Sequence, residues 1–322
     1  MLGQFVLSFV FSLILLLLSA HFLVKSSKKL SIAWSLSPIF ISLVVVALGT
    51  SLPELAVTVS SLMSGDGGLA IGNIVGSNIT NATLVFGLSV VSGSLKIGTF
   101  KTQRNAYLML IVTGLFVFLQ FSRWSGIFQA GILYVSLVAI LVYDSLLAFR
   151  GRFREDKASL LHLVKANGGK PSVWLWFPVL AVTVVVLFFS GQLLVQSVND
   201  LALVTGISTS FLGLTLTATV TSLPEILTLL IAGIKGESKI ALGTILGSNI
   251  YNLTLIGGLL SFFPTGLTPT ALANDLMYLL FTTVFLVTVV LMLKGKVVRR
   301  EVGFLGIFLF LIFLFLSYWT TA

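Results

Sequence analysis

Two glutamates lie inside long apolar segments of the chain, where a charge is costly. Glu54 and Glu225 end two identical runs, TSLPE at 50–54 and TSLPE at 221–225. An ionised carboxylate at the depth of a lipid bilayer costs free energy unless a proton, a cation or a partner neutralises it. Because no lysine or arginine lies at the same depth of any apolar segment, the sequence predicts that both carboxylates bind a cation.

Oxygen atoms other than carboxylates are expected in the same turns. Pro53 and Pro224 directly precede the glutamates, and a proline removes one backbone N–H and clashes with the carbonyl four residues earlier. We therefore expect the carbonyls near 47–50 and 218–221 to face a cavity, because free carbonyls at membrane depth are tolerated there. The hydroxyl groups in these turns belong to Thr50, Ser51, Thr221 and Ser222.

A second motif is also present twice, as GSNITN at 76–81 and GSNIYN at 247–252. In each copy a serine and an asparagine stand four residues apart, so they share one face of a helix. These residues are Ser77 with Asn81 and Ser248 with Asn252. Carboxylate, hydroxyl, amide and carbonyl oxygens are hard ligands that suit Ca²⁺ and Na⁺ and are poor ligands for Zn²⁺ or Cu⁺. Mg²⁺ would need to retain waters.

The composition excludes most soluble classes of protein. Of the 322 residues, 57% are hydrophobic and 9% are charged, against about 25% charged in soluble domains. The mean hydropathy is +1.11. A soluble enzyme, a disordered chain and a disulfide scaffold are therefore excluded. The chain has no cysteine and only two histidines, His21 and His162, so we predict no thiolate or His-rich metal site. We also predict no catalytic residues and no cofactor. The surplus of basic residues in so apolar a chain indicates membrane topology rather than a nucleic-acid partner.

The elements that must hold these residues are membrane-spanning helices. A bilayer core of about 30 Å is crossed by roughly 20 apolar residues in a helix, and ten such segments can be identified. They lie near 4–24, 37–62, 69–91, 105–122, 126–149, 173–197, 208–233, 240–262, 272–293 and 303–320. The apolar runs are continuous, so we predict an all-α polytopic membrane protein in which the first helix is retained rather than cleaved as a signal peptide.

The basic residues predict the orientation of these helices. With ten spans, Arg123 alone among the 19 lysines and arginines falls on the side of the N-terminus. Cytoplasmic loops carry the excess of lysine and arginine, so we expect both termini outside the cytoplasm, in a prokaryotic cell membrane. Eight acids fall near span ends or in loops and are expected to cap helices or pair with basic neighbours. They are Asp66, Asp144, Glu155, Asp156, Asp200, Glu237, Asp275 and Glu301.

The chain contains an internal repeat at an offset of 171 residues, the distance from Glu54 to Glu225. The match runs without a gap from 12–90 to 183–261 and aligns Pro, Glu, Asn and Gly as well as apolar residues. Five spans in each half make the two repeats inverted, which is typical of transporters whose substrate site lies where the repeats meet. We predict a first repeat at 1–149, a cytoplasmic linker at 150–172 and a second repeat at 173–322.

At these motifs the chain resembles the Na⁺/Ca²⁺ exchangers of the cation/Ca²⁺ antiporter superfamily, especially the short prokaryotic form. The likeness rests on GTSLPE at 49–54 with GNIVGSNITN at 72–81, and on TVTSLPE at 219–225 with GTILGSNIYN at 243–252. It implies that Glu54 and Glu225 are the central Ca²⁺ ligands and are shared with Na⁺. The other ligands that it implies are Thr50, Ser51, Ser77, Asn81, Thr221, Ser222 and Ser248, with the carbonyls of Ala47 and Ala218.

The resemblance further implies that the first and sixth spans slide together across the other eight. The sequence departs from the family at Asn252, where similar exchangers usually have Asp, and at Val220, where the repeat usually has Gly. The first departure leaves the stoichiometry open, because it removes an acid from the ligand set.

The leading hypothesis is therefore secondary active Na⁺/Ca²⁺ exchange that extrudes Ca²⁺ by alternating access, by a monomer. H⁺/Ca²⁺ antiport on the same scaffold is the alternative, because a pair of glutamates can exchange protons for Ca²⁺. A passive divalent channel is disfavoured by the inverted repeat. An intramembrane aspartyl protease built on Asp144 would need a second intramembrane aspartate, and Asp66 lies in a loop.

Overall fold

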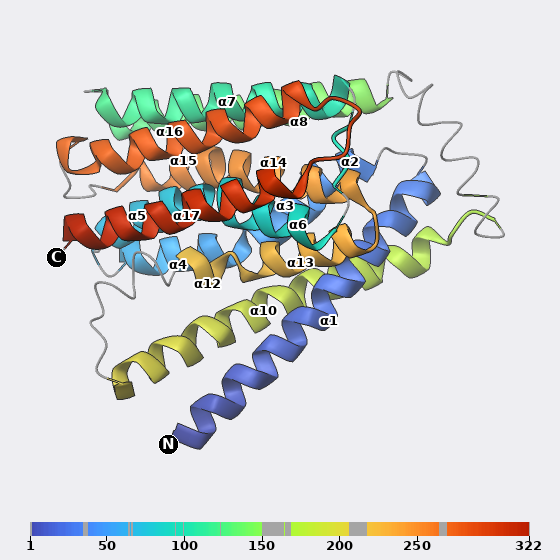
Figure 1. Cartoon of the computed structure of the whole chain (residues 1–322), viewed down its shortest axis with the longest axis horizontal. Coiled ribbons are helices and arrows are strands. Elements are labelled where there is room, and N and C mark those ends of the chain that lie inside the picture. Colours follow the sequence, from blue (N-terminus) through green and yellow to red (C-terminus); the bar gives the residue numbers. More distant parts are fainter. Residues whose placement is uncertain are drawn as a thin grey trace.

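The fold was obtained as a computed structural model, and its description covers residues 2–34, 38–63, 65, 67–93, 95–98, 100–122, 124–149, 164, 169–205, 218–263 and 269–321. Helices make up almost all of these residues, and most of them run along the long axis of the molecule (Figure 1). His162 and most of the predicted linker lie outside the described residues.

In the first half, the helices follow one another in an order that includes two π-helical turns. They are α1 (Leu2–Trp34), α2 (Pro38–Ile41), η1 (Ser42–Val46), α3 (Ala47–Thr50), α4 (Leu52–Met63), α5 (Gly67–Thr80), η2 (Asn81–Val85), α6 (Phe86–Ser92), α7 (Phe100–Phe121) and α8 (Gly126–Phe149).

The second half repeats this order where it is described. Its elements are α10 (Val173–Thr205), α12 (Ala218–Thr221), α13 (Leu223–Ile234), α14 (Ser238–Tyr251), η4 (Asn252–Ile256), α15 (Gly257–Leu260), α16 (Pro269–Met292) and α17 (Arg300–Thr321).

The lengths and compositions of these helices confirm an all-helical membrane protein. Among the described residues, 8 helices are long and apolar enough to cross a membrane, or 9 if the bent pair 42–50 and 52–63 forms one span. These nine correspond to nine of the ten predicted segments. The remaining prediction, 208–233, is described only from Ala218 onward and contains the short apolar helix α13.

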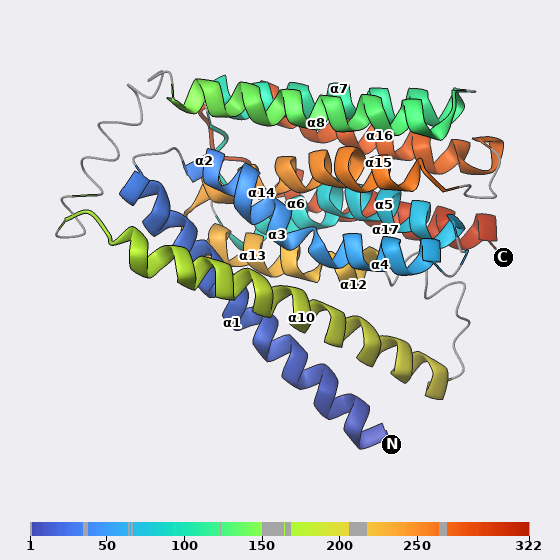
Figure 2. The same ribbon diagram turned by 180° about the vertical axis from the view of Figure 1, so that it is seen from behind.

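The two halves run in opposite directions. In Figure 1 the chain passes from α5 at the left to α6 nearer the right, whereas it passes from α14 at the right to α15 at the left. Helices α1 and α10 are likewise antiparallel and lie against each other in both views (Figures 1 and 2). This reversal is the inversion that an odd number of spans per repeat predicts.

The motif-bearing spans form the centre of the molecule. The span 67–92 is 83% buried and the span 238–260 is 94% buried, compared with 22% for the span 126–147 in α8. Glycines allow the close approach of backbones at this centre. A Cβ atom at Gly87 in α6 would lie 2.6 Å from the carbonyl oxygen of Gly303 in α17. The outer helices instead present large apolar side chains outward, as lipid contact requires.

Helices α1 and α10 form an arm with an apolar cluster of its own. Its buried members are Leu16, Leu23, Leu30, Val46, Leu180, Leu187 and Val220. Figure 1 shows the arm along one side of the bundle, with the first residues of α1 projecting away from the other helices. Val220, the departure from the expected glycine, packs in this cluster, so its side chain takes part in the contact between the arm and the bundle.

The predicted end of the first span was wrong. The helix α1 continues to Trp34, so Lys25, Lys28 and Lys29 lie on a helix rather than in a loop. Long basic side chains can extend from the end of a span to polar partners. Lys28 forms an ion pair with Glu237, and the ammonium of Lys25 lies 5.6 Å from the centre of the Trp176 ring. The second predicted span agrees with the structure to within one residue at each end, and it bends by 46° before the proline that was expected to disrupt it.

Hydrogen bonds join several basic segments at one end of the bundle. The backbone N–H of Ile97 donates to the carbonyl of Lys296 at 2.9 Å, and the N–H of Lys96 donates to Ser238 Oγ at 2.9 Å. The two chain ends lie at the opposite, left-hand side of Figure 1. The basic segments that the structure describes therefore gather at one end, as predicted, while the assignment of this end to the cytoplasm stays a prediction.

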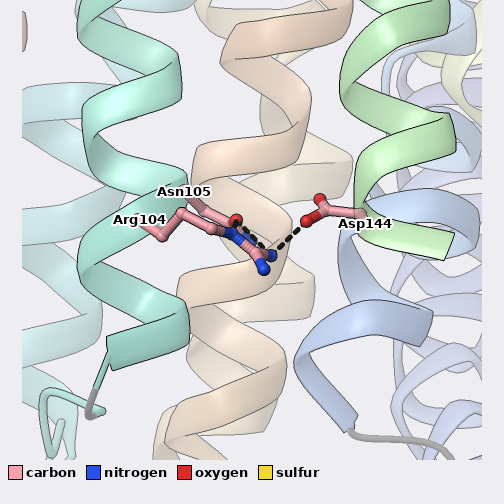
Figure 3. A network of polar contacts seen from close by, with 3 residues as sticks. All are labelled: Arg104, Asn105 and Asp144. Atoms are coloured by element: carbon pink, nitrogen blue, oxygen red, sulfur yellow. Dashed lines mark hydrogen bonds and ion pairs between the residues drawn. The ribbon is translucent and has the colours of Figure 1, made fainter. Parts of the chain in front are cut away.

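A buried ion pair joins α7 to α8 (Figure 3). Arg104 donates a hydrogen bond to Asp144, and the same guanidinium donates to Asn105 Oδ1 at 2.9 Å. The side chains of Arg104 and Asp144 are 15% and 2% exposed. Asp144 thus pairs with a basic neighbour as predicted, and so do Glu237 and Glu301. Asp66, Glu155 and Asp156 lie outside the described residues.

Candidate cation-binding site

The two TSLPE runs form matching breaks between helices. The chain interrupts its helix at Ser51 between α3 and α4, and at Ser222 between α12 and α13. The two serines have nearly identical backbone angles, with φ −82° and ψ 1° at Ser51 and φ −81° and ψ 3° at Ser222. The proline at the second position of the following helix has no N–H to offer, so the sequence itself places both breaks one turn before a glutamate.

The prediction that Ala47 and Ala218 carry released carbonyls was wrong in one respect. The Ala47 carbonyl still accepts the N–H of Ser51 at 3.0 Å, and the Ala218 carbonyl accepts that of Ser222 at 3.2 Å. The proline affects the carbonyl four residues before it, at Gly49 or Val220, rather than at the alanines. Each alanine carbonyl has a second lone pair, and this lone pair faces hydroxyl groups.

π-helical turns shape the other two spans of the site. Turns η2 and η4 begin at Asn81 and Asn252, which occupy the same place in the two repeats. A π-helical turn inserts one residue into an α-helix and frequently marks a functional site. A third turn of this kind, η1, directly precedes Ala47, and the hydroxyl of Tyr251 donates to the carbonyl of Val44 in it at 3.2 Å.

Polar side chains of one half contact those of the other half. Ser222 Oγ donates to Glu54 Oε1 at 3.3 Å. The oxygens of Thr50 and Ser248 lie 3.2 Å apart, and those of Ser77 and Thr221 lie 3.4 Å apart. Within the second half, Ser248 Oγ donates to Glu225 Oε1 at 3.3 Å. These contacts bring most of the predicted site residues together between the two repeats.

Several buried polar side-chain atoms of the predicted site residues have no hydrogen-bond partner among the described residues. They are Oε2 of both Glu54 and Glu225, Oγ of Ser51, and both polar side-chain atoms of Asn81 and Asn252. All five residues are at most 3% exposed. Buried polar groups are nearly always paired in native proteins, so unpaired oxygens in one region point to a bound ligand.

The donor chemistry is that of a hard cation. The described residues contain no group of three or more His, Cys, Asp or Glu side chains that could hold a metal ion. The site therefore has two carboxylates and otherwise only neutral oxygens, which is a ligand set for Ca²⁺ or Na⁺. Sequence reasoning singled out the twelve residues of this set and missed Asn73, which contacts both halves of the site.

Replacing Gly247 with alanine should weaken the site. A Cβ at Gly247 would lie 2.5 Å from the Cβ of Ala47 and 2.9 Å from the carbonyl oxygen of Leu43. Overpacking of this kind costs about 1–3 kcal/mol, and here the displaced segment carries Ala47. We expect G247A to lower both the thermal unfolding temperature and the affinity for the cation. The control is G131A, because a Cβ there has nothing within 4 Å, and an unchanged G247A would contradict the close contact.

Comparisons with known proteins place the chain in a family. The family model described as "Sodium/calcium exchanger protein" matches residues 4–146 and 175–319, one segment in each half. The inner membrane protein YrbG of Escherichia coli is 30% identical over 318 residues, which cover 95% of this chain and 94% of YrbG. The sodium/calcium exchanger MaX1 of Methanosarcina acetivorans is 28% identical and covers 87% of each chain.

A solved structure shares the fold. The sodium-calcium exchanger NCX_Mj, soaked with 2.5 mM Na⁺ and 0.1 mM Ca²⁺, superimposes with a TM-score of 0.78 and 26% sequence identity over 97% of this chain and 98% of NCX_Mj. Since the family model covers both halves and the fold is the same, this integral membrane protein is a transporter rather than an enzyme. The chain belongs to the sodium/calcium exchanger family.

Proposed function

We propose that this protein exchanges Na⁺ for Ca²⁺ and extrudes Ca²⁺ at the expense of inward Na⁺. One observation carries the proposal: the buried Glu54 and Glu225 each keep one oxygen unpaired among the described residues, while the other oxygen accepts a neutral hydroxyl, from Ser222 and Ser248 respectively. Relatives support the proposal. MaX1 is named a sodium/calcium exchanger, and NCX_Mj was soaked with Na⁺ together with Ca²⁺ or Sr²⁺.

The contacts between the two repeats support the proposed ligands. Glu54 and Glu225 neutralise the bound cation, and hydroxyls that already lie against these carboxylates complete its shell. The neutral ligands that we propose are Thr50, Ser51, Ser77, Asn81, Thr221, Ser222, Ser248 and Asn252, with the carbonyls of Ala47 and Ala218. Because they come from both repeats, movement of one repeat against the other can open the site to alternate sides of the membrane.

The charge of the site sets the energetics of exchange. With both glutamates ionised, one Ca²⁺ leaves the site neutral and three Na⁺ leave it with one positive charge. Moving one charge across the membrane is worth about 2.3 kcal/mol per 100 mV. Exchange of three Na⁺ for one Ca²⁺ would therefore be driven by the membrane potential, and two for one would not.

The topology completes the proposal. The basic end of the bundle faces the cytoplasm, so both termini lie outside it, as cytoplasmic loops favour lysine and arginine. A prokaryotic cell membrane is the proposed location, in line with the inner-membrane relative. The exchanger works as a monomer, because one chain supplies both halves of the site.

H⁺/Ca²⁺ antiport is the second candidate, and Asn252 favours it. With no third acid in the site, two carboxylates can be neutralised by two protons as readily as by Na⁺ ions. Protons bound to Glu54 and Glu225 would satisfy the same lone pairs that a cation occupies. Both candidates use one scaffold and differ only in the driving ion.

The deciding experiment loads proteoliposomes with ⁴⁵Ca²⁺ and imposes either a Na⁺ gradient or a pH gradient. We expect efflux with external Na⁺ and none with external acid at equal membrane potential. Valinomycin with K⁺ clamps the potential, and its variation reports whether charge moves. Efflux driven by the pH gradient alone would replace Na⁺ with H⁺ in the proposal, and efflux without either gradient would indicate a channel.

Replacing Asn252 with aspartate should tighten Ca²⁺ binding more than Na⁺ binding. Asn252 is fully buried at the start of η4, with its amide unpaired among the described residues. A third carboxylate attracts a divalent cation twice as strongly as a monovalent one, so we expect the Ca²⁺ affinity of N252D to rise about tenfold or more at alkaline pH. Calcium titrations of N252D and wild type measure this. Equal affinities would mean that position 252 does not face the cation.

A further inference from the structure

The two halves of the site differ at Asn73, which the repeat aligns with Thr244. Asn73 is fully buried, and its amide nitrogen donates to the backbone carbonyl of Glu54 at 3.0 Å and to Thr58 Oγ1 at 3.1 Å. Its amide oxygen accepts the hydroxyl of Thr221 at 3.3 Å. The hydroxyl of Thr244 donates instead within its own helix, to the carbonyl of Ile240 at 2.9 Å.

The orientation of the Asn73 amide follows from its partners. A backbone carbonyl can only accept a hydrogen bond, so the NH₂ group must face Glu54 and the amide oxygen must face Thr221. The amide oxygen therefore offers the single hydroxyl proton of Thr221 an acceptor outside the ligand set, in addition to the Ala218 carbonyl at 3.1 Å and Ser77 Oγ at 3.4 Å. When the proton points at the amide oxygen, the lone pairs of Thr221, Ala218 and Ser77 stay available to a cation.

In the other half, the described residues offer no acceptor of this kind. Thr50, the counterpart of Thr221, lies 3.2 Å from both the Ala47 carbonyl and Ser248 Oγ. Ser248 in turn lies against Glu225 Oε1 at 3.3 Å and the Ala47 carbonyl at 3.5 Å. Before a cation binds, the Thr50 hydroxyl proton therefore points at an oxygen that is itself a proposed ligand. The cation must reorient this hydroxyl before both oxygens can bind it.

We propose that Asn73 is a positioning residue that sets the preference for Na⁺ over Ca²⁺ by keeping Thr221 ready as an oxygen ligand. The inference rests on the proposed function. One Ca²⁺ takes up both carboxylates, whereas the two or three Na⁺ ions that replace it share them and together need more neutral oxygens. Na⁺ depends more on the neutral oxygens, and the side of the site next to Asn73 is the one at which they are preorganised.

The test replaces Asn73 with the residue of the other repeat. In purified N73T, we expect the Na⁺ concentration for half-maximal thermal stabilisation to rise roughly fivefold, the effect of one neutral hydrogen bond. The corresponding Ca²⁺ concentration should change by less than about twofold. N73S, which is smaller, should behave in the same way if N73T packs poorly. In liposomes, ⁴⁵Ca²⁺ efflux driven by external Na⁺ should need a higher Na⁺ concentration in these variants. Efflux in exchange for external Ca²⁺ should depend on the Ca²⁺ concentration as in wild type.

Two variants serve as matched controls. T58V removes the other side-chain partner of Asn73 but keeps the contact with Thr221, and T244S keeps the hydroxyl at the aligned position. Both should keep the wild-type ratio of Na⁺ to Ca²⁺ affinity. The proposal is overturned if the Asn73 variants lose affinity for both ions equally, lose Ca²⁺-dependent stabilisation altogether, or match wild type. By contrast, a wild type that responds to Ca²⁺ but not to Na⁺ would refute Na⁺/Ca²⁺ exchange itself.

Discussion

Replacing either Glu54 or Glu225 with glutamine should abolish cation exchange. Each carboxylate is fully buried and keeps one oxygen unpaired among the described residues. Glutamine preserves the shape of the side chain and removes the charge that neutralises the cation. Removing one partner of a buried charge interaction costs about 3–5 kcal/mol, so binding should weaken by at least about a hundredfold.

The same variants separate loss of binding from loss of fold. Because a carboxylate at membrane depth is costly without its cation, E54Q and E225Q should unfold at the same temperature as the cation-free wild type or at a higher one. The measurements are ⁴⁵Ca²⁺ flux in liposomes and unfolding temperature with and without Ca²⁺. E237Q is the control, since Glu237 pairs with Lys28 at the basic end. Undiminished Ca²⁺ flux in both site variants would refute the site.

Breaking the ion pair between Arg104 and Asp144 should produce the largest loss of stability. Asp144 is 2% exposed and Arg104 is 15% exposed in the pair that joins α7 to α8 (Figure 3). Removing one partner leaves an uncompensated buried charge, at a cost of about 3–5 kcal/mol. We expect R104M to be the more harmful single change because it leaves Asp144 charged and unpaired. D144N should cost less, because the arginine retains the hydrogen bond with Asn105.

The double variant shows whether the pair itself stabilises the fold. A buried ion pair can often be replaced by apolar residues without loss, so R104M/D144L should recover most of the stability that R104M loses. Reversible unfolding in detergent provides the free energies. The exposed pair Arg299–Glu301 is the control, with side chains 79% and 70% exposed, and E301Q should change stability by less than about 1 kcal/mol. A double variant as unstable as R104M would contradict this account.

The architecture could be predicted from the sequence because it depends on patterns that repeat. Apolar length determines the spans, the identical TSLPE runs align the two halves, and an odd number of spans inverts them. The described basic residues gather at one end because successive spans return the basic loops to the same side. This reasoning fails where charged residues continue an apolar helix. Lys25 and Lys28 suggested a loop, whereas α1 continues past them to Trp34. Their side chains find partners elsewhere in the chain, Trp176 for Lys25 and Glu237 for Lys28.

The details of the site depend on contacts that no local pattern contains. The π-helical turns at Asn81 and Asn252 look like ordinary helix in the sequence, because one inserted residue does not change the apolar pattern. Asn73 stands four residues before Ser77 and so lies on the same helix face, which is the signal that could have identified it. Its role depends on Thr221 from the other repeat, and this contact exists only in the folded chain.

The hydrogen bonds that cross between the halves have a consequence for how the chain is assembled. Ser222 satisfies Glu54, and Ser248 satisfies Thr50, so each half supplies donors or acceptors that the other half needs. During synthesis the first half enters the membrane before Ser222 is made. Until then, Glu54 must be neutralised by a proton or a cation. Two half-length polypeptides should therefore be degraded when produced alone and should rescue each other when produced together.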